Sequence, residues 1–202
     1  MLTDLPNLLT LSRIIIIPVL VGLFYLDGDV WRWVSVLLFS LAGVTDYFDG
    51  YLARKWAQIS ALGRFLDPIA DKLLVAAVIL MLVARGHITG WVVLPALVIL
   101  CREVMVSGLR EFLAQVNVGV PVSRLAKWKT ALQLIALGIL IVGDAAGDWT
   151  QFVGETGLWI AAAITMITGY DYLSAGLKHM TPRTKPAKRT PEPQGKTATP
   201  GS

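Results

Sequence analysis

Six apolar segments without a charged residue dominate this chain and restrict the folds that are open to it. The segments are 12 to 15 residues long and span 14–26, 33–45, 73–84, 88–101, 130–143 and 156–170. Each is apolar all round, whereas a helix on the surface of a soluble bundle carries a polar face. Charged residues make up 16% of the 202 residues, compared with roughly 25% in soluble domains. The composition therefore favours a membrane protein over a soluble enzyme.

The basic residues alternate between the turns in the way that membrane topology demands. If the N-terminus is cytosolic, the outer turns lie near 27–32, 85–90 and 144–155 and hold two of the 18 Lys and Arg residues. Such an excess of cations on one side follows the positive-inside rule. We expect a multi-pass protein of the cell membrane with both termini in the cytosol. Gly154 and Gly157 are expected to ease the last outer turn.

Each uncharged segment is shorter than the roughly 20 residues that span a bilayer as a helix. Several helices reach that length only by including charged residues at their cytosolic ends. Charges at such depth are costly in lipid, so they should face one another or a wet cavity. We therefore predict an all-α, polytopic membrane protein with six transmembrane helices and a cytosol-facing polar cavity. The expected membrane domain covers 1–180, and 181–202 has the composition of a disordered basic tail.

Two pairs of aspartates form the strongest chemical pattern. Asp46 and Asp49 are three residues apart, and Asp67 and Asp71 are four apart, so each pair shares one face of a helix. If the chain reverses between the pairs, four carboxylates meet at a similar depth and repel one another. Cations or protons must then neutralise them. Oxygen ligands favour hard ions such as Mg²⁺, Mn²⁺ or Ca²⁺.

The residues around these aspartates suit a phosphate ligand. Gly50 and Gly63 place no side chain beside the carboxylates, so a ligand can approach the backbone there. Arg54 follows shortly after and carries the planar fork that matches phosphate oxygens. The alternative is a set of interfacial acids that only pair with neighbouring cations.

From Asp46 to Asp71 the chain fills every fixed position of D-x2-D-G-x2-A-R-x8-G-x3-D-x3-D. In this stretch it resembles the CDP-alcohol phosphotransferases, which are membrane proteins of six helices and commonly homodimers. The resemblance implies transfer of a phosphatidyl group from CDP-diacylglycerol to an alcohol, with release of CMP. It implies two divalent cations, Mg²⁺ or Mn²⁺, on the four aspartates. It also assigns catalysis to Asp67 and Asp71, with Asp71 as the base.

The resemblance also implies that CDP binds near Asp46, Gly50, Ala53 and Arg54. We expect Gly63, Asn7 and Thr10 to complete this binding surface. Capping of the first helix is the alternative role for Asn7 and Thr10.

Four cations beyond the signature suggest the acceptor alcohol. Arg102 and Arg110 lie in the fourth segment and its extension, and Lys127 and Lys129 precede the fifth. Cations beside an acidic metal site suit an acceptor that carries its own phosphate. Sequence around them also resembles the branch of the family that uses sn-glycerol 3-phosphate. Anchoring at the membrane surface is the alternative role for these cations.

Other readings of the sequence stay open. Within the reaction class, the acceptor could be inositol phosphate, phosphatidylglycerol or serine. A divalent-cation transporter would also place acids in the membrane. Nucleic acid is not expected as a partner, although the net charge is +4. The tail beyond Leu177 carries six basic residues and one acid, which leaves the body at −1 and suits the tail to anionic membrane lipids.

We predict that Asp67→Asn or Asp71→Asn abolishes turnover, because each removes a carboxylate that the metal-and-base mechanism requires. The measurement is CMP release by purified protein, with the amount of protein in the membrane as the control for expression. Normal activity in either variant would contradict the mechanism.

Overall fold

The computed structural model describes residues 5–56, 61–116 and 124–180. Within these ranges the backbone alone is described for 5–10, 46–56, 61, 62, 64, 65, 67, 124–127, 175 and 177–180. The described chain is all-helical, without a β-strand, so the prediction of an all-α fold is confirmed. The predicted tail, 181–202, lies outside the described residues.

Six α-helices account for most of the described chain. They are α1 (Leu5–Leu23), α2 (Asp29–Trp56), α3 (Ala61–Ala84), α4 (Val93–Gln115), α5 (Arg124–Val142) and α6 (Trp149–Met180). Two 3₁₀ turns, η1 (Gly90–Val92) and η2 (Gly143–Ala146), precede α4 and α6. The predicted extension of the apolar segments is confirmed, because the helices continue through the charged positions.

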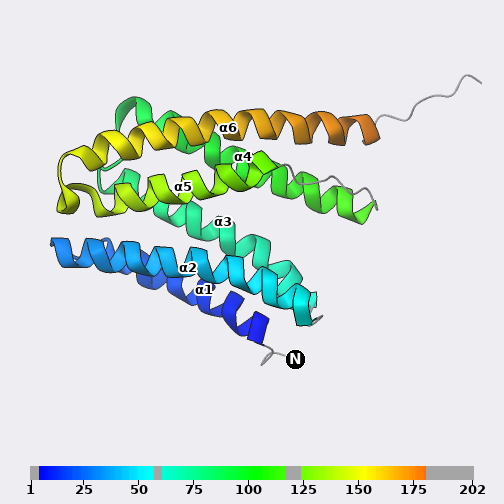
Figure 1. Ribbon diagram of the computed structural model, residues 1–202, viewed down its shortest axis with the longest axis horizontal. Helices are drawn as coiled ribbons and strands as arrows, with labels where there is room; N and C mark the ends of the chain where they lie inside the picture. Colours follow the sequence, from blue (N-terminus) through cyan, green and yellow to red (C-terminus); the bar gives the residue numbers. More distant parts are fainter. Residues whose placement is uncertain (1–4, 57–60, 117–123, 181–202) are drawn as a thin grey trace, which may run out of the picture.

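The helices run side by side and form two groups (Figure 1). α1 packs against α2 and α3, and α6 packs against α4 and α5. Contacts of α2 with α5, and of α3 with α4 and α5, join the groups. The turns at 24–28, 85–89 and 143–148 gather at what we call the loop end. We call the opposite end, where α2 ends and α3 begins, the signature end; α1 begins and α6 ends toward it (Figure 1).

A continuous apolar core joins the two groups of helices. Leu20, Leu82, Ile99, Leu137 and Leu158 are each at most 1% exposed and belong to one cluster. Where lipid surrounds the helices, close packing and not removal from water holds such side chains together.

Large apolar side chains also cover the outer surface of the bundle. Each of the six helices exposes one by at least half, as Ile15, Leu37, Leu80, Leu97, Ile135 and Ile167 show. Within the part of the chain that the structure describes, three helical stretches are long and apolar enough to cross a membrane: Gly90–Gln115, Trp128–Ala146 and Trp149–Ser174. Leu11–Leu23 is a shorter apolar helix. Such a surface belongs to a membrane protein, because water would not support it.

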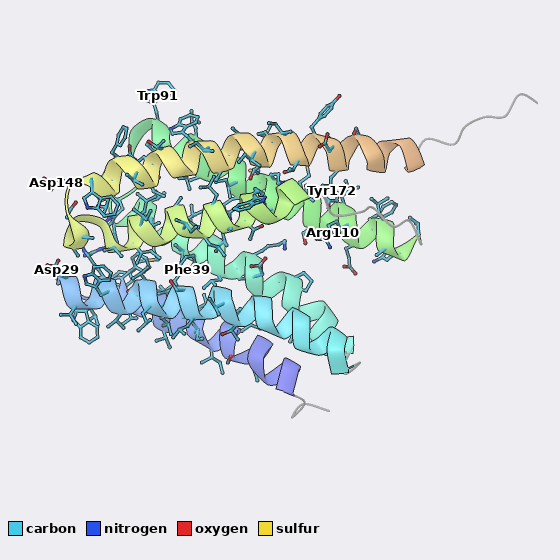
Figure 2. All side chains as sticks on the ribbon, in the orientation of Figure 1. Asp29, Phe39, Trp91, Arg110, Asp148 and Tyr172 are labelled. Atoms are coloured by element: carbon cyan, nitrogen blue, oxygen red, sulfur yellow. The ribbon has the colours of Figure 1, made fainter. Side chains whose placement is uncertain are left out.

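Tryptophans mark the loop end. Trp31, Trp33, Trp91 and Trp149 are between 40% and 80% exposed, and Trp91 projects outward there (Figure 2). Amphipathic indole rings gather where a membrane meets water. The loop end therefore has the character of a membrane boundary.

α6 begins at Trp149, earlier than the sequence suggests, so Gly154 and Gly157 lie inside the helix and not in a turn. The expectation that they ease the last outer turn was wrong. A Cβ at Gly154 would lie 2.6 Å from Leu140 Cγ, and one at Gly157 would lie 3.0 Å from the Cβ of Ala136. The two glycines therefore allow α6 to approach α5 closely, which side chains would prevent.

α3 ends in a Schellman motif. Gly86 adopts φ +76°, a left-handed conformation that glycine enters at little cost. The backbone N–H of His87 donates to Leu82 O at 2.9 Å, and that of Gly86 donates to Val83 O at 3.1 Å. These bonds satisfy carbonyls that the helix end would leave unpaired and turn the chain toward α4.

Ion pairs tie the loops of the loop end together. Arg85 donates to Asp27 at 2.8 Å, and Arg32 lies 3.8 Å from Asp144. His87 is half-buried between them, and its carbonyl accepts a hydrogen bond from Gln151 Nε2 at 2.8 Å. Burial lowers the pKa of His87 below its usual 6.5, and the nearby Arg32 and Arg85 lower it further, against the opposing charge of Asp144.

We predict that Gly154→Ala lowers the free energy of unfolding in detergent by about 1–3 kcal/mol, the usual cost of overpacking a filled contact. The melting temperature should fall accordingly. The matched control is Gly22→Ala in α1, where a Cβ would meet nothing within 4 Å. We expect the control to unfold at the wild-type temperature or slightly above it. Equal loss in both variants would contradict the close contact of α5 and α6.

We predict that acid destabilises the folded protein partly through His87. A folded-state pKa below 6.5 means that the unfolded chain binds the proton more readily. The contribution of His87 to stability is therefore complete above about pH 6.5 and is lost as the pH falls toward the folded-state pKa. Between about pH 7.5 and about pH 5, the melting temperature of His87→Gln should fall less than that of wild type. An equal fall in the melting temperatures of His87→Gln and wild type would refute this role of His87.

Candidate active site

The signature aspartates lie on two consecutive helices at matching heights. Asp49 and Asp46 stand seven and ten residues before the end of α2, and Asp67 and Asp71 stand six and ten residues after the start of α3. At about 1.5 Å per residue, all four positions lie roughly 9–15 Å from the helix ends that face each other along the chain. Equal heights along the two helices are one condition for a shared site.

The structure describes the side chain of one of these four residues, Asp71. The side chains of Asp46, Asp49 and Asp67 lie outside the described set. Among the described side chains there is no group of three or more candidate metal ligands. The prediction of a metal site therefore rests on the positions of the four aspartates along α2 and α3. Their carboxylates suit hard divalent cations.

The Asp71 carboxylate has a cation beside it on the same helix. Its Oδ2 lies 3.8 Å from Nζ of Lys72, the next residue of α3. The residue predicted to be the base therefore lies beside a positive charge.

A buried charged cluster connects α4 and α5. Glu103 Oε1 accepts hydrogen bonds from Lys129 Nζ and from Arg102 Nη1, the latter at 3.2 Å. The side chains of Lys129 and Arg102 are only 3% and 8% exposed. Breaking such a buried pair commonly costs about 3–5 kcal/mol, because it leaves an uncompensated charge. Glu103 therefore holds two of the predicted acceptor residues together.

Beside this cluster a polar cavity of about 230 Å³ lies between α3 and α4. Charged and hydroxyl side chains in its lining are Lys72, Arg102, Glu103, Ser107, Arg110 and Glu111. Among the described residues, Arg110 has no ion-pair partner; it is exposed toward the signature end (Figure 2). The cavity thus brings together two of the four predicted acceptor residues, Arg102 and Arg110. Lys129 lies behind Glu103, and the side chain of Lys127 is outside the described set.

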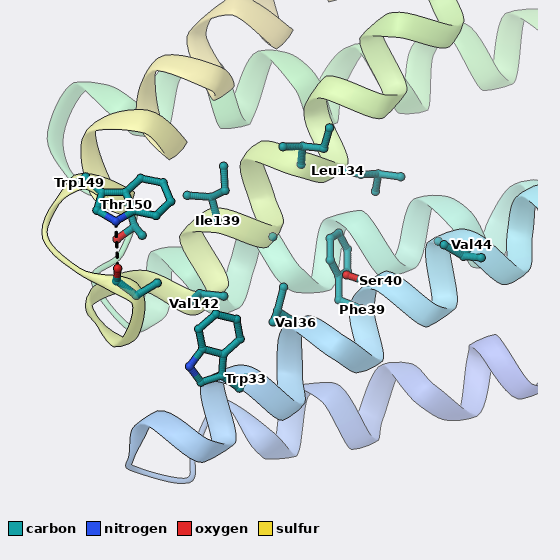
Figure 3. A pocket seen from close by; sticks show the side chains of 14 residues that line it. Trp33, Val36, Phe39, Ser40, Val44, Leu134, Ile139, Val142, Trp149 and Thr150 are labelled. Atoms are coloured by element: carbon teal, nitrogen blue, oxygen red, sulfur yellow. Dashed lines mark hydrogen bonds between the residues drawn. The ribbon is translucent and has the colours of Figure 1, made fainter.

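A larger cavity has the opposite character. This apolar groove of about 670 Å³ lies between α2 and α5, with Trp33, Phe39 and Leu134 in its lining (Figure 3). Trp149 closes one side and donates from Nε1 to the Ala146 carbonyl at 2.9 Å. Its lining offers no charge to a phosphate, so of these two cavities the polar one suits an anionic ligand better.

The predicted CDP-binding positions all fall on α1, α2 and α3. Asn7 and Thr10 occupy the first two turns of α1, so neither precedes the helix as an N-cap would. The described part of this surface includes Gly63, which is partly buried. The side chains of Asn7, Thr10, Ala53 and Arg54 are outside the described set.

Sequence reasoning missed three residues near this site. Lys72 lines the polar cavity, although its place beside Asp71 suggested only an ion pair. Thr168 accepts a hydrogen bond from Arg102, and Gly169 contacts the stem of Arg102. Both lie in an apolar stretch of α6 that carries no chemical signal. Arg13 of α1 is 1% exposed and buried in the bundle.

Comparison with known proteins agrees with the geometry. A relative from Rickettsia typhi is 52% identical over 174 residues, 85% of this chain and 96% of the relative. One from Salmonella typhimurium is 41% identical over 174 residues, 85% and 94% of the two chains. One from Cereibacter sphaeroides is 37% identical over 214 residues, 88% and 97%. Each is named CDP-diacylglycerol–glycerol-3-phosphate 3-phosphatidyltransferase.

The family match covers most of the described helices. Residues 3–167 match CDP-alcohol phosphatidyltransferase and include the four aspartates, the charged cluster of α4 and α5, and much of α6. The predicted resemblance is thereby confirmed. The chain belongs to the CDP-alcohol phosphatidyltransferase family.

Proposed function

We propose that this chain transfers the phosphatidyl group of CDP-diacylglycerol to the hydroxyl of sn-glycerol 3-phosphate and releases CMP. The observation that carries the proposal is the cationic cavity beside Asp71, in a chain whose relatives are named for this reaction. A bond forms between the acceptor oxygen and the lipid-linked phosphorus, and the bond from that phosphorus to CMP breaks.

The four aspartates supply the ligands for two cations, Mg²⁺ or Mn²⁺. Members of the family generally depend on divalent cations. When bound, such ions neutralise the pyrophosphate and stabilise the departing CMP. Asp46 and Asp49 on α2, with Asp67 and Asp71 on α3, would hold them. The matching heights of the two pairs support this set.

Asp71 accepts the proton of the attacking hydroxyl, as a positioned carboxylate can in general base catalysis. Its closeness to Lys72, which lines the acceptor cavity, supports this role. CDP binds along α2 and α3, beside Gly50, Ala53, Arg54 and Gly63, with Asn7 and Thr10 of α1. Positioning and neutralisation of charge then account for most of the catalysis.

The acceptor phosphate binds in the polar cavity. Arg102 and Arg110 provide charge-assisted hydrogen bonds, and Lys72 adds a third cation. Lys127 and Lys129 raise the positive potential from α5. A phosphate dianion suits this concentration of cations, whereas serine would leave much of it uncompensated.

All six helices cross the inner membrane, with the signature end and both termini in the cytosol. Their lengths of 19 to 32 residues and the apolar side chains on every helix support this topology. The tryptophans mark the outer boundary. The active protein is a homodimer, as is common in the family.

We predict that the purified chain releases CMP from CDP-diacylglycerol with sn-glycerol 3-phosphate, and that EDTA stops the reaction. Inositol phosphate, serine and phosphatidylglycerol should give little product. Arg110→Ala should raise KM for glycerol 3-phosphate about tenfold or more, because a hydrogen bond to a charged group is lost.

The matched control is Arg85→Ala at the loop end, which should leave both KM values unchanged. Strong product with another acceptor would refute the acceptor assignment. Turnover that persists in EDTA would refute the metal site.

A further inference from the structure

The side chain of Arg102 crosses from α4 to α6. The side chain is 8% exposed, and its stem runs past Gly169 of α6. A Cβ at Gly169 would lie 3.1 Å from Arg102 Cγ and 3.5 Å from Nε. Because the stem is buried, it could not move freely away from a methyl group. The absence of a side chain at Gly169 therefore leaves room for the stem of Arg102.

The neighbouring residue of α6 holds the tip of the same side chain. Arg102 Nη2 donates to Thr168 Oγ1 at 3.1 Å. Thr168 is 1% exposed, and its hydroxyl donates in turn to the Ile164 carbonyl at 2.9 Å. Since the hydroxyl proton is directed to the helix backbone, a lone pair remains for the guanidinium.

The two terminal nitrogens of Arg102 have partners of different charge. Nη1 is bonded to the Glu103 carboxylate, which Lys129 shares, and Nη2 is bonded to the neutral Thr168. Nε has no hydrogen-bond partner among the described residues. Thr168 thus orients the guanidinium. Unlike a second carboxylate, it does not neutralise the positive charge. The cluster of Arg102, Lys129 and Glu103 keeps one net positive charge beside the cavity.

We propose that Thr168 and Gly169 are positioning residues for the acceptor phosphate: together they fix the Arg102 guanidinium, still charged, in the wall of the polar cavity. The inference rests on the proposed function of Arg102 in binding that phosphate. Neither residue touches the reacting atoms. Their effect is therefore on the affinity for glycerol 3-phosphate and not on CDP-diacylglycerol.

The test compares Thr168→Val, which keeps the shape and removes the acceptor, with Thr168→Ser, which keeps the hydroxyl. Thr168→Val should raise KM for glycerol 3-phosphate about fivefold to tenfold, the scale of losing one typical hydrogen bond. KM for CDP-diacylglycerol and kcat should stay near wild type, and Thr168→Ser should restore the acceptor KM. Gly169→Ala should raise the same KM by displacing the arginine stem.

Thr165→Val is a matched control one turn earlier on α6. Thr165 is fully buried, and its Oγ1 has no hydrogen-bond partner among the described residues. Removing that hydroxyl should change neither KM. Melting temperatures in detergent show whether each variant is folded. If Thr168→Val does not fold, Gly169→Ala carries the test.

Arg102→Lys separates this inference from the proposed function. It should raise KM for glycerol 3-phosphate, and adding Thr168→Val to it should have little further effect, because the bond is already lost. If Arg102→Lys raises that KM while Thr168→Val and Gly169→Ala leave it unchanged, the positioning role is refuted and the acceptor site stands. An unchanged KM in Arg102→Lys would overturn both. Equal increases in both KM values on Thr168→Val would indicate a general structural effect and refute the inference.

Discussion

Glu103 holds together two cations that an apolar helix bundle could not otherwise accommodate. Arg102 and Lys129 come from different helices and are both almost completely buried. Without the shared carboxylate, each would carry the large cost of an unpaired charge away from water. The burial of Arg102 and Lys129 beside the polar cavity depends on this compensation.

The two ends of the bundle use charge differently. At the loop end, acids and arginines pair one to one across exposed turns, so they join loops and leave little net charge. Toward the signature end, cations exceed their described partners around a cavity that is open to a ligand. The apolar groove between α2 and α5 has neither property. Size alone would have pointed to that groove, whereas electrostatics points to the polar cavity.

Much of this could be read from the sequence, because apolar segments and paired aspartates follow helical periodicity. The six helices and their continuation through Asp46, Asp67 and Arg102 needed no knowledge of tertiary contacts. The start of α6 and the role of Gly154 could not be predicted without tertiary contacts. A glycine gives the same sequence signal in a turn and at a close helix contact. Thr168 was invisible for a similar reason, because only the folded bundle brings it to Arg102.

The matching heights of the aspartates on α2 and α3 give a meaning to the interval that separates Arg54 from Gly63. That interval includes the last two residues of α2 and the first two residues of α3. One residue inserted within α2 after Asp49 would lengthen that helix by about 1.5 Å, and one inserted ahead of Asp67 in α3 would turn the second pair by about 100° relative to the helix start. The residues of α2 after Asp49 and those of α3 before Asp67 therefore set how level the two pairs of aspartates lie.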